Sequence, residues 1–299
     1  MLSTDCLNDK LKDKPGLSPA TQAALHVPDL KLAACVRCYL SRSTLGADLL
    51  PSQRLNHFSS SVYVTLNWHL VGTIDRAWMG EDERIPQRIV GTSFCGPRTV
   101  PMCSRNPGPV RTFSVALMPD AVQALTGLDM SAHVNQAHPL HHVLDSNWQA
   151  MAQDVQNAAD DHQRIAVLEQ FLLPRWQAVR RQTVSQANQI SAWVQALLIR
   201  AATSGLGQSA RQKERRVKTW AGLSKRELRG LARAEAGFIQ GQAERARDAG
   251  ASFADLAALT GYADQAHLSR ITRKVTGLSP TELVKAINEE ESYWSYRLF

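Results

Sequence analysis

The chain has 299 residues, 44% of them hydrophobic, and a formal net charge of +7. This length predicts two domains, and the apolar content suffices for real cores. No uncharged apolar run reaches about 18 residues, and the polar start "MLSTDCLNDKLKDKPGLSP" lacks the apolar core of a secretion signal, so we expect a cytoplasmic protein without a membrane partner. Five cysteines, an odd number, favour reduced thiols over a disulfide framework.

The positive charge is concentrated in the C-terminal part of the chain. Residues 1–173 carry 14 Lys and Arg against 16 Asp and Glu, whereas residues 174–299 carry 20 against 11. The two parts therefore have formal charges of −2 and +9. This asymmetry favours a C-terminal domain that binds a polyanion, although a solvated basic surface predicts the same charge.

The first third of the chain predicts an extension followed by strands. Residues 1 to about 30 are broken by prolines and predict a flexible extension. The stretch "VYVTLNWHLVG" (62–72) alternates apolar and polar residues with period two, as a half-buried strand does. Further strands are predicted at "QRIVGTSFCG" (87–96) and "VRTFSVALMP" (110–119). Together these stretches indicate a small all-β unit from about 33 to 118.

The pattern then becomes helical. Helices are predicted at "PDAVQALTGL" (119–128), "SNWQAMAQDVQNAADD" (146–161) and "HQRIAVLEQFLLPRWQAVRRQ" (162–182). In the last of these, apolar residues recur at three and four positions, which is typical of a core-facing stripe but also of a dimer seam. "TVSQANQ" (183–189) is the expected linker between the two halves.

The C-terminal part carries repeated helix-start signals. The pairs Ser224/Glu227, Ser252/Asp255 and Ser279/Glu282 each offer a capping hydroxyl and an acid three residues later. Pro280 follows the last capping serine at the first helical position, where its missing N–H has no consequence.

A supersecondary unit is duplicated. "SARQKERRVKTWAGLS" (209–224) and "DQAHLSRITRKVTGLS" (264–279) each run from a capping residue to a glycine, share an arginine at the same place, and end in Gly-Leu-Ser. An alanine-containing helix and a glycine turn precede each copy, which is the helix-turn-helix pattern.

The polarity of these helices has a physical explanation. In the second copy Leu268, Ile271 and Val275 supply only a narrow apolar stripe. A recognition helix buries such a stripe, while its other face enters the major groove, about 12 Å wide, and offers donors to base edges. A connecting helix from Ser224 to about Ala249 would be roughly 38 Å long. That length is compatible with placing the two motifs in adjacent major-groove turns, about 34–36 Å apart.

Residues about 190–287 therefore resemble the DNA-binding domain of AraC/XylS-type transcriptional regulators, which is built from two helix-turn-helix motifs joined by a helix. "GYADQAHLSRITRKVTGLSP" (261–280) is close to that family's most diagnostic stretch, and "SARQKERRVKTWAGLSKRELR" (209–229) matches the second half of its first motif. The resemblance implies an α+β chain. A cupin-like β-barrel with following helices would span 31–182, and an all-α DNA-binding domain would span 183–299, with motifs at about 193–222 and 252–276.

The resemblance also implies which residues bind DNA. The base-facing positions of the family fall on Arg211, Gln212 and Arg215 in the first motif and on Gln265, His267 and Arg270 in the second, and the adjoining DNA-binding cations are Arg216, Lys218, Arg273 and Lys274.

Two positions depart from the family pattern. Lys213 stands where the first motif usually buries a leucine, and Thr272 stands where the second usually buries a phenylalanine. Because burying a free ammonium is prohibitive, we expect the Lys213 side chain to reach outward.

For the N-terminal half, the resemblance implies a domain that senses a small molecule and a following helix that supports dimerisation. Asn67, Trp68 and His69 are the candidate effector-pocket residues. The expected partners are promoter DNA, RNA polymerase, an unknown small-molecule effector and a second copy of the chain. We therefore expect an effector-responsive transcription regulator, whether activator or repressor.

An alternative rests on Cys35-Val-Arg-Cys38, which has the spacing of a zinc or redox pair. It predicts a thiol-redox sensor or a zinc-thiolate methyl acceptor resembling the Ada-type DNA-repair regulators. An alternating strand would place these two cysteines on opposite faces, which argues against a metal pair. The cluster "HPLHH" (138–142) with His133 is a second candidate metal group. The sequence contains no nucleophile elbow, P-loop or G-x-G-x-x-G motif before a helix, so we expect no enzyme and no cofactor.

Overall fold

The computed structural model describes residues 17–18, 20–74, 76–79, 90–179, 190–204, 209–247 and 252–298. The predicted linker at 183–189 and the predicted domain boundary lie outside these residues. Within them, no helix combines the length and the hydropathy that a bilayer crossing needs.

The N-terminal half is built of antiparallel strands in two sheets. The larger sheet has the order β1-β2-β8-β4-β6-β9, and the smaller has the order β3-β7-β5. The strands of the described residues are β1 (Gln22–His26), β2 (Val36–Ser43), β3 (Leu55–Phe58), β4 (Val64–Val71), β5 (Arg76–Met79), β6 (Thr92–Cys95), β7 (Met102–Arg105), β8 (Arg111–Leu117) and β9 (Ala137–Pro139).

The larger sheet has one apolar face and one mixed face, as the alternation in β4 predicts. Leu66 and Trp68 are fully buried, and the Trp68 indole N–H donates to the Ala152 carbonyl oxygen at 2.9 Å. Residues on the opposite face of β4, such as Thr65 and Asn67, face a cavity between the two sheets. The sheet therefore separates a hydrophobic core from an internal space.

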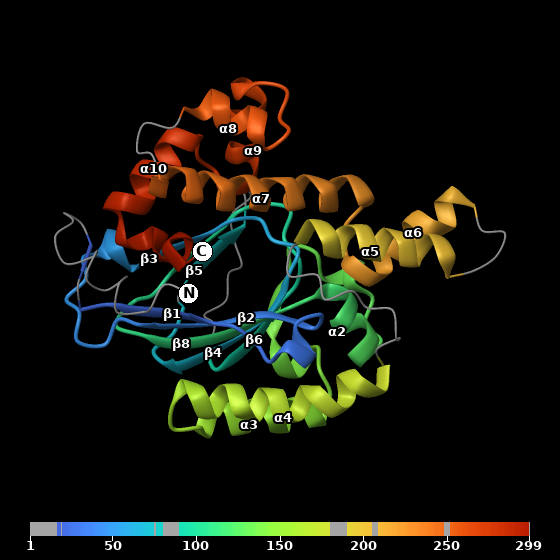
Figure 1. Cartoon of the computed structure of the whole chain (residues 1–299). Coiled ribbons are helices and arrows are strands. Elements are labelled where there is room, and N and C mark those ends of the chain that lie inside the picture. Colours follow the sequence, from blue (N-terminus) through green and yellow to red (C-terminus); the bar gives the residue numbers. More distant parts are fainter. Residues whose placement is uncertain are drawn as a thin grey trace.

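Helices cover the apolar face of the larger sheet. In Figure 1, α3 and α4 lie along one side of this sheet, and the C-terminal helices lie on the other. The predicted stripe on α4 is confirmed as core-facing, because Leu168, Leu172 and Trp176 are buried. These helices are α2 (Pro119–Thr126), α3 (Ser146–Asn157) and α4 (Asp161–Val179).

The C-terminal half is helical, and its two motifs are joined by one helix of 23 residues, α7. At about 1.5 Å per residue this connector is roughly 35 Å long. The helices are α5 (Ile190–Thr203), α6 (Ala210–Ala221), α7 (Lys225–Arg247), α8 (Phe253–Leu259), α9 (Gln265–Thr276) and α10 (Pro280–Glu289). The mixed fold class expected from the sequence, antiparallel strands followed by helices, is confirmed.

Two glycines that weaken α7 as a helix allow it to pack closely against α8. A Cβ atom at Gly241 would lie 3.0 Å from a Leu256 methyl, and one at Gly237 would lie 3.5 Å from the Tyr262 ring. Both glycines are buried on the face that meets the second motif. Each glycine costs up to about 1 kcal/mol of helix stability relative to alanine. In return, the absence of a side chain lets α7 pack closely against the second motif.

One hydrophobic core joins the two halves. It runs from Leu32 beside the larger sheet, through Trp148 of α3, to Leu197 of α5 and Ala232 of α7. The separate domains predicted from the sequence are therefore packed against each other as one body.

The structure corrects the predicted flexible extension for its last residues. Strand β1 pairs along its whole length with β2, from Gln22 opposite Ser43 to His26 opposite Tyr39. Its sequence, QAALH, contains none of the β-branched or aromatic residues that usually indicate a strand, so its pairing comes from the sheet edge it meets. Residues 1–16 and 19 lie outside the described residues.

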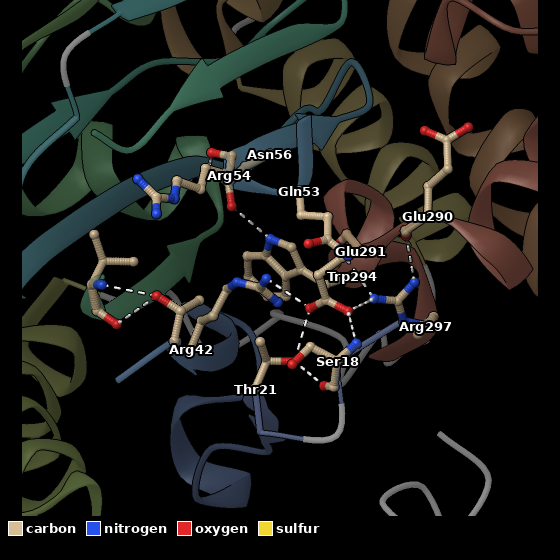
Figure 2. Close-up of polar contacts among 12 residues, drawn as sticks. Ser18, Thr21, Arg42, Gln53, Arg54, Asn56, Glu290, Glu291, Trp294 and Arg297 are labelled. Atoms are coloured by element: carbon tan, nitrogen blue, oxygen red, sulfur yellow. Dashed lines mark hydrogen bonds and ion pairs between the residues drawn. The ribbon is translucent and has the colours of Figure 1, made fainter. Parts of the chain in front are cut away.

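The end of the chain returns to the N-terminal sheets. The one-turn segments of η5 (Glu291–Leu298) follow α10 and lie beside β3. Glu291 is 2% exposed, and its carboxylate accepts hydrogen bonds from Arg42 at 2.8 Å and from the Thr21 hydroxyl at 2.8 Å. Figure 2 shows this network, in which Trp294 also donates to the Asn56 side-chain oxygen at 2.9 Å.

We predict that Glu291→Ala destabilises the whole chain. The substitution leaves Arg42, which is 3% exposed, without its counter-charge. Breaking a buried pair on one side costs about 3–5 kcal/mol. Urea unfolding followed by tryptophan fluorescence measures the loss. Glu290→Ala, at the exposed neighbouring position, is the control and should change stability by less than about 0.5 kcal/mol. Equal losses in the two variants would contradict the role given to the pair.

Candidate nucleic-acid interface

The duplicated sequence unit is also a duplicated structure. α6 and α9 each have 12 residues, and each ends at a glycine with positive φ, 77° at Gly222 and 85° at Gly277. At the other end, the Ser209 hydroxyl accepts from the Gln212 N–H and the Asp264 carboxylate accepts from the His267 N–H. In both copies, therefore, the residues that the spacing predicts as caps bind the free backbone groups at the start and the end of the helix.

The predicted start signals of the following helices are confirmed as well. Ser279 and Glu282 form a reciprocal capping box at α10, with Pro280 in the first turn. Ser224 and Glu227 exchange the same two hydrogen bonds at the start of α7. Ser252 caps α8 through the Asp255 N–H.

The exposed face of α6 presents cations along one stripe. Arg211, Arg215 and Lys218 are exposed and recur at spacings of four and three residues, so they share a face of the helix. The opposite face is held in the core by Val217 and Ala221, which are 2% and 0% exposed. This face can reach an anionic partner without rearrangement of the helix.

Two residues assigned to DNA in the first motif make contacts within the motif instead. The Gln212 side-chain oxygen accepts from the Ser209 N–H at 2.9 Å, which completes the helix cap. The Arg216 guanidinium donates to the Ala201 carbonyl oxygen and to the Ser204 hydroxyl, and it lies over the Trp220 ring. Arg216, named from the sequence as a DNA-binding cation, thus fastens α6 to α5 in this structure.

The second motif exposes Gln265, Arg270, Arg273 and Lys274 on α9. Arg273 donates to the Glu282 carboxylate at 3.3 Å, and both side chains of this pair are more than half exposed.

His267 is half-buried, and its ring stands edge-on to the Tyr262 ring with centroids 5.3 Å apart. The structure therefore separates His267, which closes the turn, from the exposed residues of α9.

The two positions that depart from the family pattern are tolerated for different reasons. Lys213 is only half-buried, as its long side chain predicts. The Thr272 hydroxyl donates to the Leu268 carbonyl oxygen one turn earlier, at 2.9 Å. That hydrogen bond satisfies the hydroxyl inside a half-buried face.

The cations at the ends of both recognition helices lie within electrostatic reach of one carboxylate at the start of α7. Partial burial opposes ionisation of Glu227, but hydrogen bonds from Ser224 and the charges of Lys218 and Lys274 outweigh it and lower its pKa. The C-terminal ends of α6 and α9 therefore both approach the first turn of the connector.

An acid in the N-terminal half fastens the first motif. Asp120, 7% exposed on α2, accepts from the Trp193 indole N–H at 2.9 Å and pairs with Arg200 at 2.7 Å. Arg200 in turn lies 4.6 Å over the centre of the Trp220 ring on α6. The sequence identified Asp120 only as part of a helix start, and no local signal indicates its distant partners.

A cavity of about 310 Å³ lies between the sheets and the second motif. Asn67 and His69, two of the candidate effector-pocket residues, line it, whereas Trp68, the third, lies on the opposite face of β4 and does not. Burial lowers the pKa of His69, whose Nδ1 lies 3.1 Å from the Gly91 carbonyl oxygen. The ring is therefore neutral at pH 7.

The connector α7 forms part of the cavity wall. Glu235 on α7 pairs with Arg37 of β2 at 3.2 Å and accepts from the Tyr63 hydroxyl at 3.0 Å. Leu268 and Thr272 of α9 also face this space. Of the described lining residues, none comes from α6.

The cysteines do not assemble into a metal centre in the part of the chain that the structure describes, where no group of three or more His, Cys, Asp or Glu side chains could hold an ion. Cys35 is buried in the hydrophobic core, whereas Cys38 lines the cavity. Burial raises the pKa of Cys38 to about 12, although the nearby Arg37 opposes the shift. Neither thiol is thus prepared as a nucleophile or a metal ligand.

The clustered histidines pack as aromatic side chains. The His133 ring stands edge-on to Phe94 with centroids 5.2 Å apart, and His141 packs against His142 at 4.3 Å. The His57 ring likewise stacks on the Tyr293 ring, with centroids 4.4 Å apart.

No family model matches the sequence, and no curated protein matches it either. Among solved structures, the chain is similar to ToxT from Vibrio cholerae, with 9% identity, 89% of this chain and 98% of that chain covered, and a TM-score of 0.40. A ToxT structure bound to (E)-4-(8-methylnaphthalen-1-yl)but-3-enoic acid gives 10% identity, the same coverage and a TM-score of 0.40. The AraC-like transcriptional activator CuxR gives 14% identity, 96% and 89% coverage, and a TM-score of 0.30.

We predict that Cys35 and Cys38 resist iodoacetamide in the folded protein at pH 8. A thiol with a pKa of about 12 is then ionised in only about one molecule in ten thousand, and the thiolate is the reacting species. Labelling of Cys38 should increase as the pH rises toward 12. Peptide mass spectrometry reads the labels, and the same protein in urea is the control that labels fully. Rapid labelling at pH 8, or one zinc ion per chain, would restore the thiol-based alternative.

Proposed function

We propose that this chain is a DNA-binding transcription regulator of the AraC/XylS type, which reads promoter DNA with α6 and α9 and responds to a small-molecule effector. One observation carries the proposal. Two helices of equal length each follow another helix, each is capped by a side chain at its start and by a glycine at its end, each exposes cations and amides, and one long helix joins the two motifs.

The chemistry of the two exposed faces fits base reading. Arg211 and Arg215 of α6 and Arg270 of α9 offer the paired N–H groups that match guanine O6 and N7, and Gln265 offers the amide that matches adenine. Lys218 and Lys274, at the other ends of the same helices, suit phosphate contacts, which position a protein without specifying sequence.

Arg273 is also proposed to contact phosphate. Its pair with Glu282 is exposed on both sides, and water screens such pairs so that they contribute little. DNA phosphates can therefore replace Glu282 as the partner of Arg273 at little cost. Gln212 and Arg216 support the first recognition helix rather than read bases.

The packing of both motifs on α7 supports binding to two segments of one duplex. The C-terminal ends of α6 and α9 both approach the first turn of this connector, and α8 packs on its middle. The two motifs therefore lie along one helix as one unit, and we propose that both follow one side of the DNA. A second copy of the chain and RNA polymerase are further proposed partners, and promoter DNA as the target implies action in the cytoplasm.

The cavity provides the route by which an effector would act. Its wall combines strand residues with α7 and with Leu268 and Thr272 of α9. An occupant would therefore touch the second motif directly. By linkage, a ligand that binds one arrangement of α9 more tightly changes DNA affinity by the same factor that DNA changes ligand affinity.

We predict that Arg270→Ala and Gln265→Ala each weaken binding to a selected DNA site by about 1–3 kcal/mol and relax base preference at one position. The full chain is the protein to test, because α5 is fastened to α2 and η5 is packed against β3. Selection from a random-sequence DNA library supplies the site and reads out the preference. Arg175→Ala on α4, across the sheet from the motifs, is the control. Unchanged base preference in both α9 variants would contradict base reading by this helix.

We predict a different result for Lys218→Ala. Loss of one phosphate contact should weaken all sequences alike and reduce the slope of log affinity against log salt by about 1. Fluorescence anisotropy over a salt series, on the selected site and on an unrelated duplex, measures both effects. A wild-type affinity for DNA that did not depend on salt would contradict the proposal that the C-terminal half binds a polyanion.

A further inference from the structure

One loop of the N-terminal half lies against the ends of both recognition helices. This loop, residues 97–101, belongs to the connection between β6 and β7. At the end of α6, a Cβ atom at Gly222 would lie 3.2 Å from the Pro97 ring. At the end of α9, a Cβ atom at Gly277 would lie 3.9 Å from the Pro101 ring. The two glycine caps of the repeat therefore face the two prolines that bound this loop.

The end of α9 is also capped by the N-terminal half. The last four carbonyl groups of a helix have no partner within the helix and need one from outside. In α9 the Val275 carbonyl oxygen, in the last turn, accepts from the Ser60 N–H at 2.8 Å and from the Ser60 hydroxyl at 3.0 Å. Two donors from outside the motif thus hold the end of this recognition helix.

Residues 59–61 and the loop form one unit. The backbones of Ser61 and Arg98 exchange two hydrogen bonds, of 2.9 and 2.7 Å. The Arg98 guanidinium also donates to the Ser59 carbonyl oxygen at 3.5 Å. The platform that residues 59–61 and 97–101 make together therefore contacts both recognition helices as one piece.

Asn135 holds the loop in one position. Its N–H donates to the Pro97 carbonyl oxygen at 2.8 Å, and its side-chain amide exchanges two hydrogen bonds with Thr99, both of 2.9 Å. Its φ of 56° is the only positive value at a residue other than glycine in the described part of the chain. Asparagine adopts that conformation more readily than most residues. Three hydrogen bonds thus fix the loop to the segment that follows η3 (Met130–His133), on which α6 packs.

The platform and the connector α7 meet the same ends of the two helices. Lys218 and Lys274, in the last turns of α6 and α9, both lie within electrostatic reach of Glu227 in the first turn of α7. The two ends are therefore near each other, and the platform lies against both. Contacts with the N-terminal half, in addition to α7, thus set the separation of the two helices.

We propose that the platform is a positioning element, which fixes the separation of α6 and α9 and thereby the number of base pairs between the two DNA segments that the chain reads. This inference rests on the proposed function and gives the N-terminal half a part in DNA specificity. Each added base pair moves one segment by about 3.4 Å and rotates it by about a tenth of a turn. Two helices held at one separation therefore fit one spacing and bind the others more weakly.

The experiment measures affinity against spacing. Selection with the wild-type full chain supplies the two base segments, and duplexes then carry both segments with spacers that differ by single base pairs. Fluorescence anisotropy gives the affinity for each duplex and for duplexes with one segment alone. The wild type should prefer one spacer over its neighbours by about tenfold or more, because a displaced helix loses at least one base contact.

Two double variants test the platform contacts. Ser60→Ala/Asn135→Gly removes the hydroxyl that binds Val275 and both side-chain bonds to Thr99, while glycine keeps the positive φ. Its preference for one spacer should fall below about threefold, with its affinity for single segments unchanged. Ser60→Thr/Asn135→Asp keeps the hydroxyl and the acceptor for the Thr99 N–H, and it should retain the wild-type preference.

A matched pair of single variants acts on the helix ends. Gly222→Ala and Gly277→Ala place alanine at similar φ, 77° and 85°, so their backbone strain is alike. The added methyl group meets the platform closely only in Gly222→Ala, at 3.2 Å from the Pro97 ring. Gly222→Ala should therefore change the spacer preference, and Gly277→Ala should retain it.

Thermal unfolding, measured on the same proteins, separates positioning from stability. A lowered midpoint of Ser60→Ala/Asn135→Gly with equal loss of affinity for every spacer would identify a structural role and overturn the proposal. An unchanged spacer preference in both this double variant and Gly222→Ala would overturn it as well. Salt-sensitive wild-type binding that is indifferent to spacer length overturns this inference alone. Absence of DNA binding by the wild type removes the proposed function, and this inference with it.

Discussion

The buried pair of Arg42 and Glu291 is the contact on which the arrangement of the two halves depends. Arg42 belongs to β2, near the start of the chain, and Glu291 follows the last helix of the second motif. The same carboxylate binds Thr21, beside β1, and Arg297. These contacts hold η5 against β3, and η5 brings Trp294 and Tyr296 into the cavity wall. The pair therefore helps to hold η5, and with it part of the cavity wall, against the N-terminal strands.

Local signals made most of the helical half predictable. Capping residues, the glycine at the end of each recognition helix and the repeated spacing all act within one turn of the chain, so α6, α7, α9 and α10 occur close to their expected bounds. The strand at β4 was equally clear, because alternation is local. What the sequence did not reveal depends on partners far along the chain. β1 has no strand signal of its own, and the contacts of Asp120 and Glu291 become visible only when the chain is folded.

The sequence predicted which helices carry the candidate site better than it predicted where individual side chains on them point. Spacing identified the two helices of the repeat, and five of the cations on them are exposed: Arg211, Arg215, Lys218, Arg270 and Lys274. Gln212 and Arg216 carry suitable donors and lie on the same helix, yet the helix cap and the α5 carbonyl group bind them. Trp68 was misplaced because neighbours on a strand point to opposite faces, so it cannot share a pocket with Asn67 and His69.

The two motifs are held in unequal ways. Asp120 fixes the first motif to α2, whereas the second motif borders a space large enough for a ligand. The second motif is fastened as well, because the Ser60 N–H donates to the Val275 carbonyl oxygen of α9 at 2.8 Å and η5 holds the end of α10 beside β3. The first motif is thus anchored through a helix and the second through the strand region. A change in the spacing of α2 and the smaller sheet would therefore be passed to the two motifs separately.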